Sequence, residues 1–403
     1  MVLLPNGRIS STREIDPKLP FLRLAFRPFF WLGALFSLLS IGIWGLSFTG
    51  YIEFTPFGGG YFWHAHEMLF GFAVAIICGF LLTAVQTWTG VPSIKGKLLA
   101  LLVIIWLIAR ILLAFPSVVP HGFIILIDLL FLPLAAFFLA IPIIKVQMWR
   151  NLFFVPVLLL MSVINGLMHL SAQQVIAISF LTLSHVMVLL VTLIMCVMAG
   201  RVFPMFTASG TNTTKVVPIK WLEQLSIASV VGCVFLTTNL LTLSPALEAG
   251  VFITAAIANF VRALRWRIWV TLKTPLVWPL HLSYWAICTG LLMLGLNRLG
   301  LLSNISLAFH AITVGGAGLM ILAMISRVSL GHTGRKLLVG HVMTLAFGLI
   351  VLTFVARVVS PLFLSSYTFL ILLSCTLWIL AYGIFVIVYF PVLSRPRIDG
   401  SAG

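Results

Sequence analysis

The chain has 403 residues, of which 62% are hydrophobic and only 8% are charged. This balance excludes a soluble globular protein and is typical of a protein that crosses a membrane as helices. The formal net charge of +16 does not indicate nucleic-acid binding, because the lysines and arginines are dispersed over short loops instead of being gathered on one face. We therefore expect an all-α, polytopic bundle whose partner is the lipid bilayer and not nucleic acid.

Apolar runs predict about twelve transmembrane helices, since one span takes about 20 residues. In chain order they are expected at residues 29–48, 62–88, 98–115, 121–141, 152–170, 175–199, 222–243, 247–266, 276–297, 304–327, 337–359 and 365–390. The chain thus divides into an amino-terminal tail (1–28), a single transmembrane helical domain (29–390) and a carboxy-terminal tail (391–403).

The basic residues predict the orientation of the bundle. Loops on the cytoplasmic side carry an excess of lysine and arginine. With the amino terminus inside, only Arg110, Arg298 and Arg357 of the 24 basic residues fall outside or within the membrane. We therefore expect both termini in the cytoplasm.

The histidines fall into layers when each is given a depth from the helical rise of about 1.5 Å per residue. The outer layer holds His64, His66, His121, His169 and His310, the midplane holds His185, and the inner layer holds His281, His332 and His341. His332 is expected in the loop between the tenth and eleventh helices. Ionisable groups in or beside hydrocarbon are costly to keep there, so the outer layer is a candidate site.

The stretch 63–68 (WHAHEM) is the strongest candidate, because it places His64, His66 and Glu67 at the mouth of a long apolar run. Two residues apart on a helix, the imidazoles are turned about 200° from each other, so one metal ion takes both only if the helix begins after them. The preceding run 58–60 (GGG) favours a non-helical approach. A helix that begins earlier would put His64 and Glu67 on one face and aim His66 elsewhere. The alternative role for all three is to anchor the helix at the interface.

His310 lies six residues into the tenth predicted helix, above Gly315, Gly316 and Gly318. The glycines leave a notch that admits either a neighbouring helix or the flat face of a macrocycle such as haem. The similar depth of His310 and the 63–68 stretch favours a shared site.

Arg110 and Asp128 match in depth on neighbouring predicted helices, so we expect them to form an ion pair, which is either architectural or lies beside a haem propionate or an anion path. Arg357, near the outer end of its helix, is a natural propionate partner. On the inner side, His281 either ligates a second cofactor or forms a hydrogen bond across helices.

Several long motifs in one order resemble the NnrS family over about residues 21–390. They are 26–30 (FRPFF), 63–71 (WHAHEMLFG), 79–84 (GFLLTA) with 88–90 (WTG), 200–207 (GRVFPMFT), and 310–311 (HA) through 331–335 (GHTGR).

The resemblance implies a bacterial inner-membrane protein of twelve helices that contains haem and copper and is associated with denitrification and tolerance of nitric oxide. The chain has no C-x-x-C-H site, so the haem is expected to be non-covalent and of b type. The resemblance carries over onto the motif histidines His64, His66, His281, His310 and His332. The expected cofactor-binding residues are His64, His66, His281, His310, Arg110 and Arg357, and the expected metal ligands are His64, His66, Glu67, His310 and His332.

The leading hypothesis is a protein with haem and copper in its outer half that binds nitric oxide, turns it over as an oxidoreductase or protects against its products, with an electron donor that the sequence does not identify. A second hypothesis is a twelve-helix transporter of a metal complex or small metabolite, with the histidines as a relay. No counterpart of 63–67 occurs in the second half of the chain, which counts against common transporter folds. A gas or redox sensor ranks third, because no effector domain is present.

Overall fold

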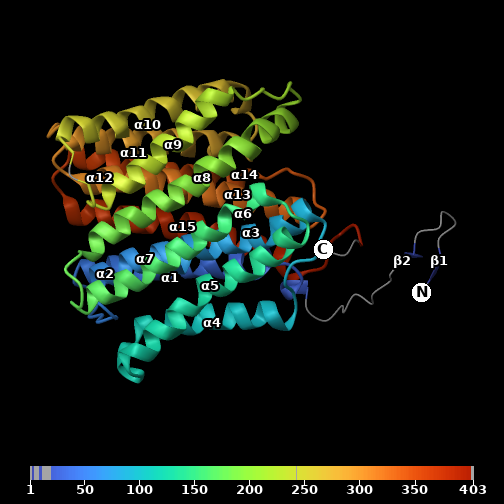
Figure 1. Ribbon diagram of the computed structural model, residues 1–403, viewed down its shortest axis with the longest axis horizontal. Helices are drawn as coiled ribbons and strands as arrows, with labels where there is room; N and C mark the ends of the chain where they lie inside the picture. The colour runs from blue at the N-terminus through green and yellow to red at the C-terminus, as the bar shows by residue number, and fades with distance from the viewer. Residues whose placement is uncertain (1, 4–8, 11–19, 242, 401–403) are drawn as a thin grey trace.

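The computed structural model describes residues 2–3, 9–10, 20–241 and 243–400. Most of the predicted amino-terminal tail, including Arg8, Arg13 and Lys18, lies outside the described residues, as do residues 401–403 of the predicted carboxy-terminal tail. The chain that follows is an all-helical bundle (Figure 1).

The bundle consists of long helical rods, some of them built from consecutive elements. In order they are α1 (Phe26–Phe48); α2 (Gly59–His66), η2 (Glu67–Ala73) and α3 (Val74–Thr89); α4 (Lys97–Ala114); α5 (His121–Lys145); α6 (Trp149–Leu152) and α7 (Phe154–Ala172); α8 (Phe180–Thr211); α9 (Lys220–Thr237); α10 (Pro245–Arg265); α11 (Trp278–Arg298); α12 (Ile305–His310), η5 (Ala311–Gly318) and α13 (Leu319–His332); α14 (His341–Phe354), η6 (Val355–Val359) and η7 (Ser360–Leu362); and α15 (Tyr367–Ser394). Short elements complete the description: β1 (Val2–Leu3) paired with β2 (Ile9–Ser10), η1 (Pro20–Leu22), η3 (Pro116–Val118) and η4 (Ile268–Thr271).

The predicted spans agree closely with these rods. Eleven helices in the described part of the chain are long and apolar enough to cross a membrane. The predicted span 222–243 corresponds to α9, which is not among the eleven and carries Lys220, Glu223 and Gln224 in its first turns. It packs against α8 and α10 within the bundle.

Two predicted boundaries are wrong. The span expected at 175–199 is α8, which runs on to Thr211 through Pro204 and ends where Asn212 takes a left-handed conformation. His332 does not lie in a loop but is the last residue of α13. The helix stops only there, because Gly334 follows with a φ of +73° that other residues adopt at a cost.

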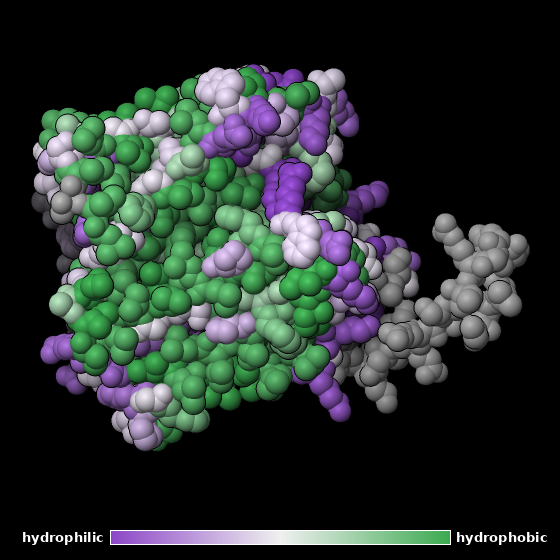
Figure 2. Space-filling model, viewed as in Figure 1, coloured by the Kyte–Doolittle hydropathy of each residue, from purple (hydrophilic) through white to green (hydrophobic). Residues whose placement is uncertain are grey.

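Both ends of the bundle domain lie on one side, as the topology prediction requires. Arg27 at the start of α1 donates from Nη1 to the backbone carbonyls of Leu393 and Arg395 at the end of α15, at 2.8 and 2.7 Å. In Figure 1 this end is on the right, and α2 and α12 lie at the opposite end. Figure 2 shows an apolar band between the two ends, with hydrophilic residues gathered at each.

Three rods form the centre of the bundle. The most apolar 18-residue stretch is 83% buried in the α2–η2–α3 rod and 78% buried in both α8 and the α12–η5–α13 rod, whereas it is 33% buried in α15 and 39% in α5. The central rods contain the histidine motifs, so these motifs face protein and not lipid.

Three segments of the rods are π-helical: η2 after His66, η5 after His310, and η6, which contains Arg357. A π-helical turn inserts an extra residue, shifts the side chains that follow it and often occurs at functional sites. Each of these three segments contains or directly follows a residue expected to bind a cofactor.

The close packing of α11 on the α12–η5 rod provides a test of the fold. A Cβ atom on Gly290 would lie 2.5 Å from Ile312 Cγ1 and 2.8 Å from the Ala308 carbonyl oxygen. Gly290→Ala is therefore expected to lower the melting temperature of the purified protein, at a cost of about 1–3 kcal/mol for overpacking. Gly348→Ala, in α14 with nothing within 4 Å of its Cβ position, is the matched control and should leave the melting temperature unchanged or slightly raised. Equal melting temperatures for the two variants would contradict this packing.

Candidate functional site

The start of α2 determines how the histidine motif is presented. The helix begins at Gly59, with Gly58 at a φ of +69° as its N-cap, so His64 and His66 are both helical. They are turned about 200° from each other and contact different neighbours. The condition under which one ion could take both imidazoles is therefore not met. Glu67, where the helix continues as η2, contacts His66, with 2.8 Å between Oε1 and the Nδ1 of that ring.

His66 belongs to a fully buried polar group drawn from four helices. We call it the buried polar group and define it as His66 and Glu67 from the α2–η2 rod, Arg110 from α4, Asp128 from α5, and Asn165 and His169 from α7. None of these six residues is more than 4% exposed. All of them lie within spans of apolar helix.

The guanidinium of Arg110 joins the two carboxylates of this group. Its Nη1 donates to Glu67 Oε1 at 2.7 Å, and its Nη2 donates to Asp128 Oδ1 in a short contact. Glu67 Oε1 also lies 2.8 Å from Nδ1 of His66. The predicted Arg110–Asp128 ion pair is confirmed, and Glu67 is a second partner of the same arginine.

The other oxygen of Asp128 is surrounded by nitrogen atoms. Asn165 Nδ2 donates to Oδ2 at 2.7 Å, and Nε2 of His169 lies 2.9 Å from it. Nε2 of His66 lies 3.2 Å from the same oxygen and 2.8 Å from Asn165 Oδ1. His66, Asp128 and His169 thus bring three potential metal-ligand atoms within 4.8 Å of one another, and they form the one such cluster found among the described residues.

The charges of the buried polar group do not cancel. Two carboxylates face one guanidinium, which leaves one negative charge when the imidazoles are neutral. Two atoms also lack a hydrogen-bond partner among the described residues, Glu67 Oε2 and His169 Nδ1. An uncompensated charge in a low-dielectric interior is costly, so this group is suited to hold one further cation or proton.

A second site lies at the same end of the bundle around Arg357. We call it the arginine–histidine site and define it as His64, His310 and Arg357. The charge of Arg357 acts on both imidazoles, and Ser306 Oγ, a contact of Arg357, lies 3.1 Å from His310 Nδ1. Arg357 Nη2 donates weakly to Ser306 Oγ and Tyr367 Oη, each at 3.4 Å, and Nη1 is buried without a partner among the described residues.

His310 is held in the tautomer that a metal ligand needs. Its Nδ1 lies 2.7 Å from the Ser306 carbonyl oxygen, one helical turn earlier, so the proton is on Nδ1 and the lone pair is on Nε2. His64 is positioned differently, by stacking on Trp44 with 4.6 Å between ring centroids. Next to His310 in the sequence, the ring of Phe309 stacks on that of His185, with 3.7 Å between ring centroids.

The remaining predicted residues are not part of these two sites. His281 is buried on α11, with Nε2 at 2.8 Å from Thr207 Oγ1. His332 packs its ring against Phe26 at the opposite end of the bundle. Because His310 and His332 are 22 residues apart on one continuous rod, they are about 30 Å apart and cannot share an ion.

The glycine notch below His310 is filled by neighbouring helices. A Cβ atom at Gly315 would meet Phe354, one at Gly316 would meet Ile287, and one at Gly318 would meet Trp378, all at 2.6 Å or less. Of the two uses considered for the notch, the structure shows helix packing.

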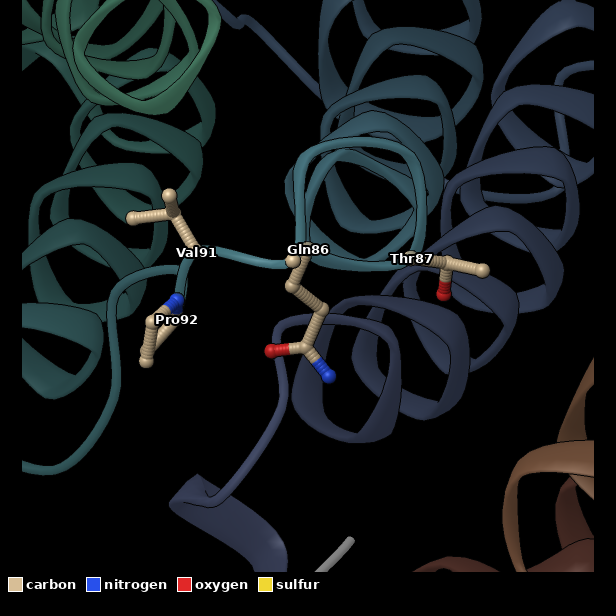
Figure 3. Close-up of a pocket in the computed structure, with 5 residues that line it drawn as sticks. Gln86, Thr87, Val91 and Pro92 are labelled. Atoms are coloured by element: carbon tan, nitrogen blue, oxygen red, sulfur yellow. The ribbon is translucent and has the colours of Figure 1, made fainter. Parts of the chain in front are cut away.

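Two hollows in the described part of the protein lie outside these two groups of residues. One, of about 290 Å³, is lined at the end of α3 by Gln86, Thr87, Gly90, Val91 and Pro92, none of which is titratable (Figure 3). A second, apolar hollow of about 270 Å³ lies beside Gly315 and Phe354, between α11, η5 and α14. We identify the candidate site by the buried polar residues and not by these hollows, because chemistry on a small ligand needs polar or metal-binding groups.

Two members of the buried polar group, Asn165 and His169, were not selected from the sequence. The available signal was depth, since His169 was placed in the outer layer beside His66. Asn165 and His169 are four residues apart, so they lie on one face of α7, and this spacing identifies Asn165 as a neighbour of His169.

The ion pairs of Arg110 are expected to dominate local stability. Arg110→Leu leaves Glu67 and Asp128 buried without their cation, which typically costs about 3–5 kcal/mol. The melting temperature of the purified variant should fall by many degrees. The control is Arg298→Leu, which removes a partly exposed pair with Glu248 and should cost about 0–1 kcal/mol. A small effect of Arg110→Leu would show that the pair is not essential to the bundle.

Comparison with known proteins identifies the family. The model of the family described as NnrS protein matches residues 20–397, nearly the whole chain. A search of curated proteins found no match. The family match and the eleven apolar helices agree, and the chain belongs to the NnrS family.

Proposed function

We propose that this protein binds haem and copper in the bacterial inner membrane, and that it binds, turns over or protects against nitric oxide. The family link to nitric oxide supports the ligand. The distribution of lysine and arginine along this chain supports an orientation with both termini in the cytoplasm and both candidate sites in the outer half of the membrane. The observation that carries the proposal is the arginine–histidine site, where a ligand-ready imidazole adjoins an arginine with an unpaired buried nitrogen.

The residues of this site fit a haem group. His310 offers Nε2, because its Nδ1 proton is held by the Ser306 carbonyl. Arg357 has no carboxylate partner among the described residues, and its free Nη1 suits a propionate. His64, on which the charge of Arg357 also acts, would line the same haem site. We propose that His66 contributes to the copper site instead, since it is turned away from His64.

Bound haem would supply an iron atom that takes nitric oxide as a ligand. The protein's own part is to hold the imidazole, neutralise the propionate and exclude water from the site. Nitric oxide is small, neutral and lipid-soluble, so a site inside the membrane needs no aqueous channel for it. Trp44, Phe309 and Tyr367 surround the site with aromatic rings and so keep it apolar.

The proposal predicts a haem absorption band and bound copper in the anaerobically purified protein. His310→Ala should abolish or strongly reduce the haem band, because it removes the ligand that Ser306 orients. His341→Ala, an exposed histidine on α14, is the control and should retain it. Addition of nitric oxide should shift the band in the wild type, and turnover with a reductant would separate an enzyme from a binding protein. A wild-type protein with neither haem nor copper would exclude the proposed function.

The role of Arg357 can be tested separately. Arg357→Leu should weaken haem affinity by about tenfold or more, as expected for loss of one charge-assisted hydrogen bond. Arg357→Lys should recover part of this affinity, because it restores the charge without the planar guanidinium. Haem titration of the apoprotein measures both. If all three proteins bind haem equally, Arg357 does not contact a propionate.

A further inference from the structure

We propose that His66, Asp128 and His169 are the ligands of one divalent first-row transition-metal ion, held by Nε2 of each imidazole and Oδ2 of the carboxylate. The ligand set stands on the geometry of the buried polar group. Only the choice of copper as the native ion rests on the proposed function.

The distances match those around a bound ion. Ligand atoms about 2.0–2.2 Å from one ion, at angles between 90° and 109°, are separated by about 2.8–3.6 Å. Asp128 Oδ2 lies 3.2 Å from His66 Nε2 and 2.9 Å from His169 Nε2. Both nitrogen atoms therefore face the same oxygen, and the two ring centroids are 5.0 Å apart.

The surrounding residues hold the ligands as metal sites require. A ligating histidine usually donates its other ring N–H to a carboxylate, which fixes the ring and the tautomer. His66 has this arrangement, with Nδ1 2.8 Å from Glu67 Oε1, and its Nε2 would exchange its present hydrogen bond to Asn165 Oδ1, at 2.8 Å, for the bound ion. Arg110 holds Glu67 Oε1 and Asp128 Oδ1 together, which leaves Asp128 Oδ2 turned toward the imidazoles. Glu67 is therefore a positioning residue and not a ligand.

The charge of the group favours a cation. Its two carboxylates exceed its single guanidinium by one negative charge, and it lies in a buried, apolar part of the bundle. One added proton on the His66–Glu67 pair brings the net charge to zero, and a divalent cation changes it to +1. The convergence of a third group, His169, on the same oxygen favours the cation, because neutralisation by a proton on that pair does not require it.

The ligand set also limits which metal ions the site can bind. Two imidazoles and one carboxylate suit copper, iron(II) and zinc, whereas magnesium and calcium prefer oxygen ligands throughout. Among divalent ions, copper binds such sites most tightly, and a two-histidine, one-carboxylate set with open positions is also the arrangement of non-haem iron(II). Either ion, held by these three ligands, would keep coordination positions open for a small ligand.

The decisive variant is His169→Gln. Glutamine can still donate a hydrogen bond to Asp128 Oδ2, so the network and the fold are retained, while the imidazole ligand is lost. The matched control is His121→Gln, because His121 and His169 both pack edge-on against Phe57, at 5.1 and 5.4 Å, but His121 is exposed and outside the group.

The measurement is total copper, iron and zinc per protein, with haem iron subtracted by its own absorption assay. We expect about one equivalent of non-haem metal in the wild type and in His121→Gln, and at least a tenfold loss in His169→Gln at an unchanged melting temperature and haem band. Copper supports the site with its native ion, and non-haem iron or zinc supports the site with another. Wild-type protein without non-haem metal, or His169→Gln with undiminished metal, overturns the proposal. The haem band and its response to nitric oxide report separately on the proposed function.

Discussion

The pair of salt bridges from Arg110 to Glu67 and Asp128 is the interaction on which the rest of this structure depends. One guanidinium joins the α2–η2 rod, α4 and α5, and Asp128 extends the connection to α7 through Asn165 and His169. Helices in a bilayer gain little from burying apolar surface against each other, so buried polar contacts contribute much of their specificity. Four helices are thus fixed at one point, and that point coincides with a group suited to a metal ion.

The π-helical segments explain how ordinary apolar helices present such groups. In η2, which begins at Glu67, the Gly71 carbonyl accepts a hydrogen bond from Trp106 Nε1 at 3.1 Å. Gly71 itself adjoins Glu67 Oε2, where a Cβ atom would stand 3.0 Å away. Sequence periodicity alone assumes 3.6 residues per turn and therefore misplaces the side chains that follow a π-helical segment.

Much of the fold could be predicted, because apolar length is set by the bilayer and the helices follow it. Depth alone paired Arg110 with Asp128 correctly and placed His310 six residues into its rod. What failed depends on local backbone: the glycines at 58–60 favoured a non-helical start, yet Gly59 and Gly60 are helical, and the helix beyond Arg327 continues to His332. The membership of Asn165 and His169 depends on which helices are adjacent, and a single sequence carries no such signal.

The two-residue spacing of His64 and His66 has a mechanical consequence. A single turn of α2 serves both the arginine–histidine site and the buried polar group, so a rotation of this helix moves both imidazoles at once, in opposite directions. A ligand that fixed the angle of one ring would therefore also restrict the other. Residues 64–66 (HAH) thus connect the two sites through one turn of a single helix.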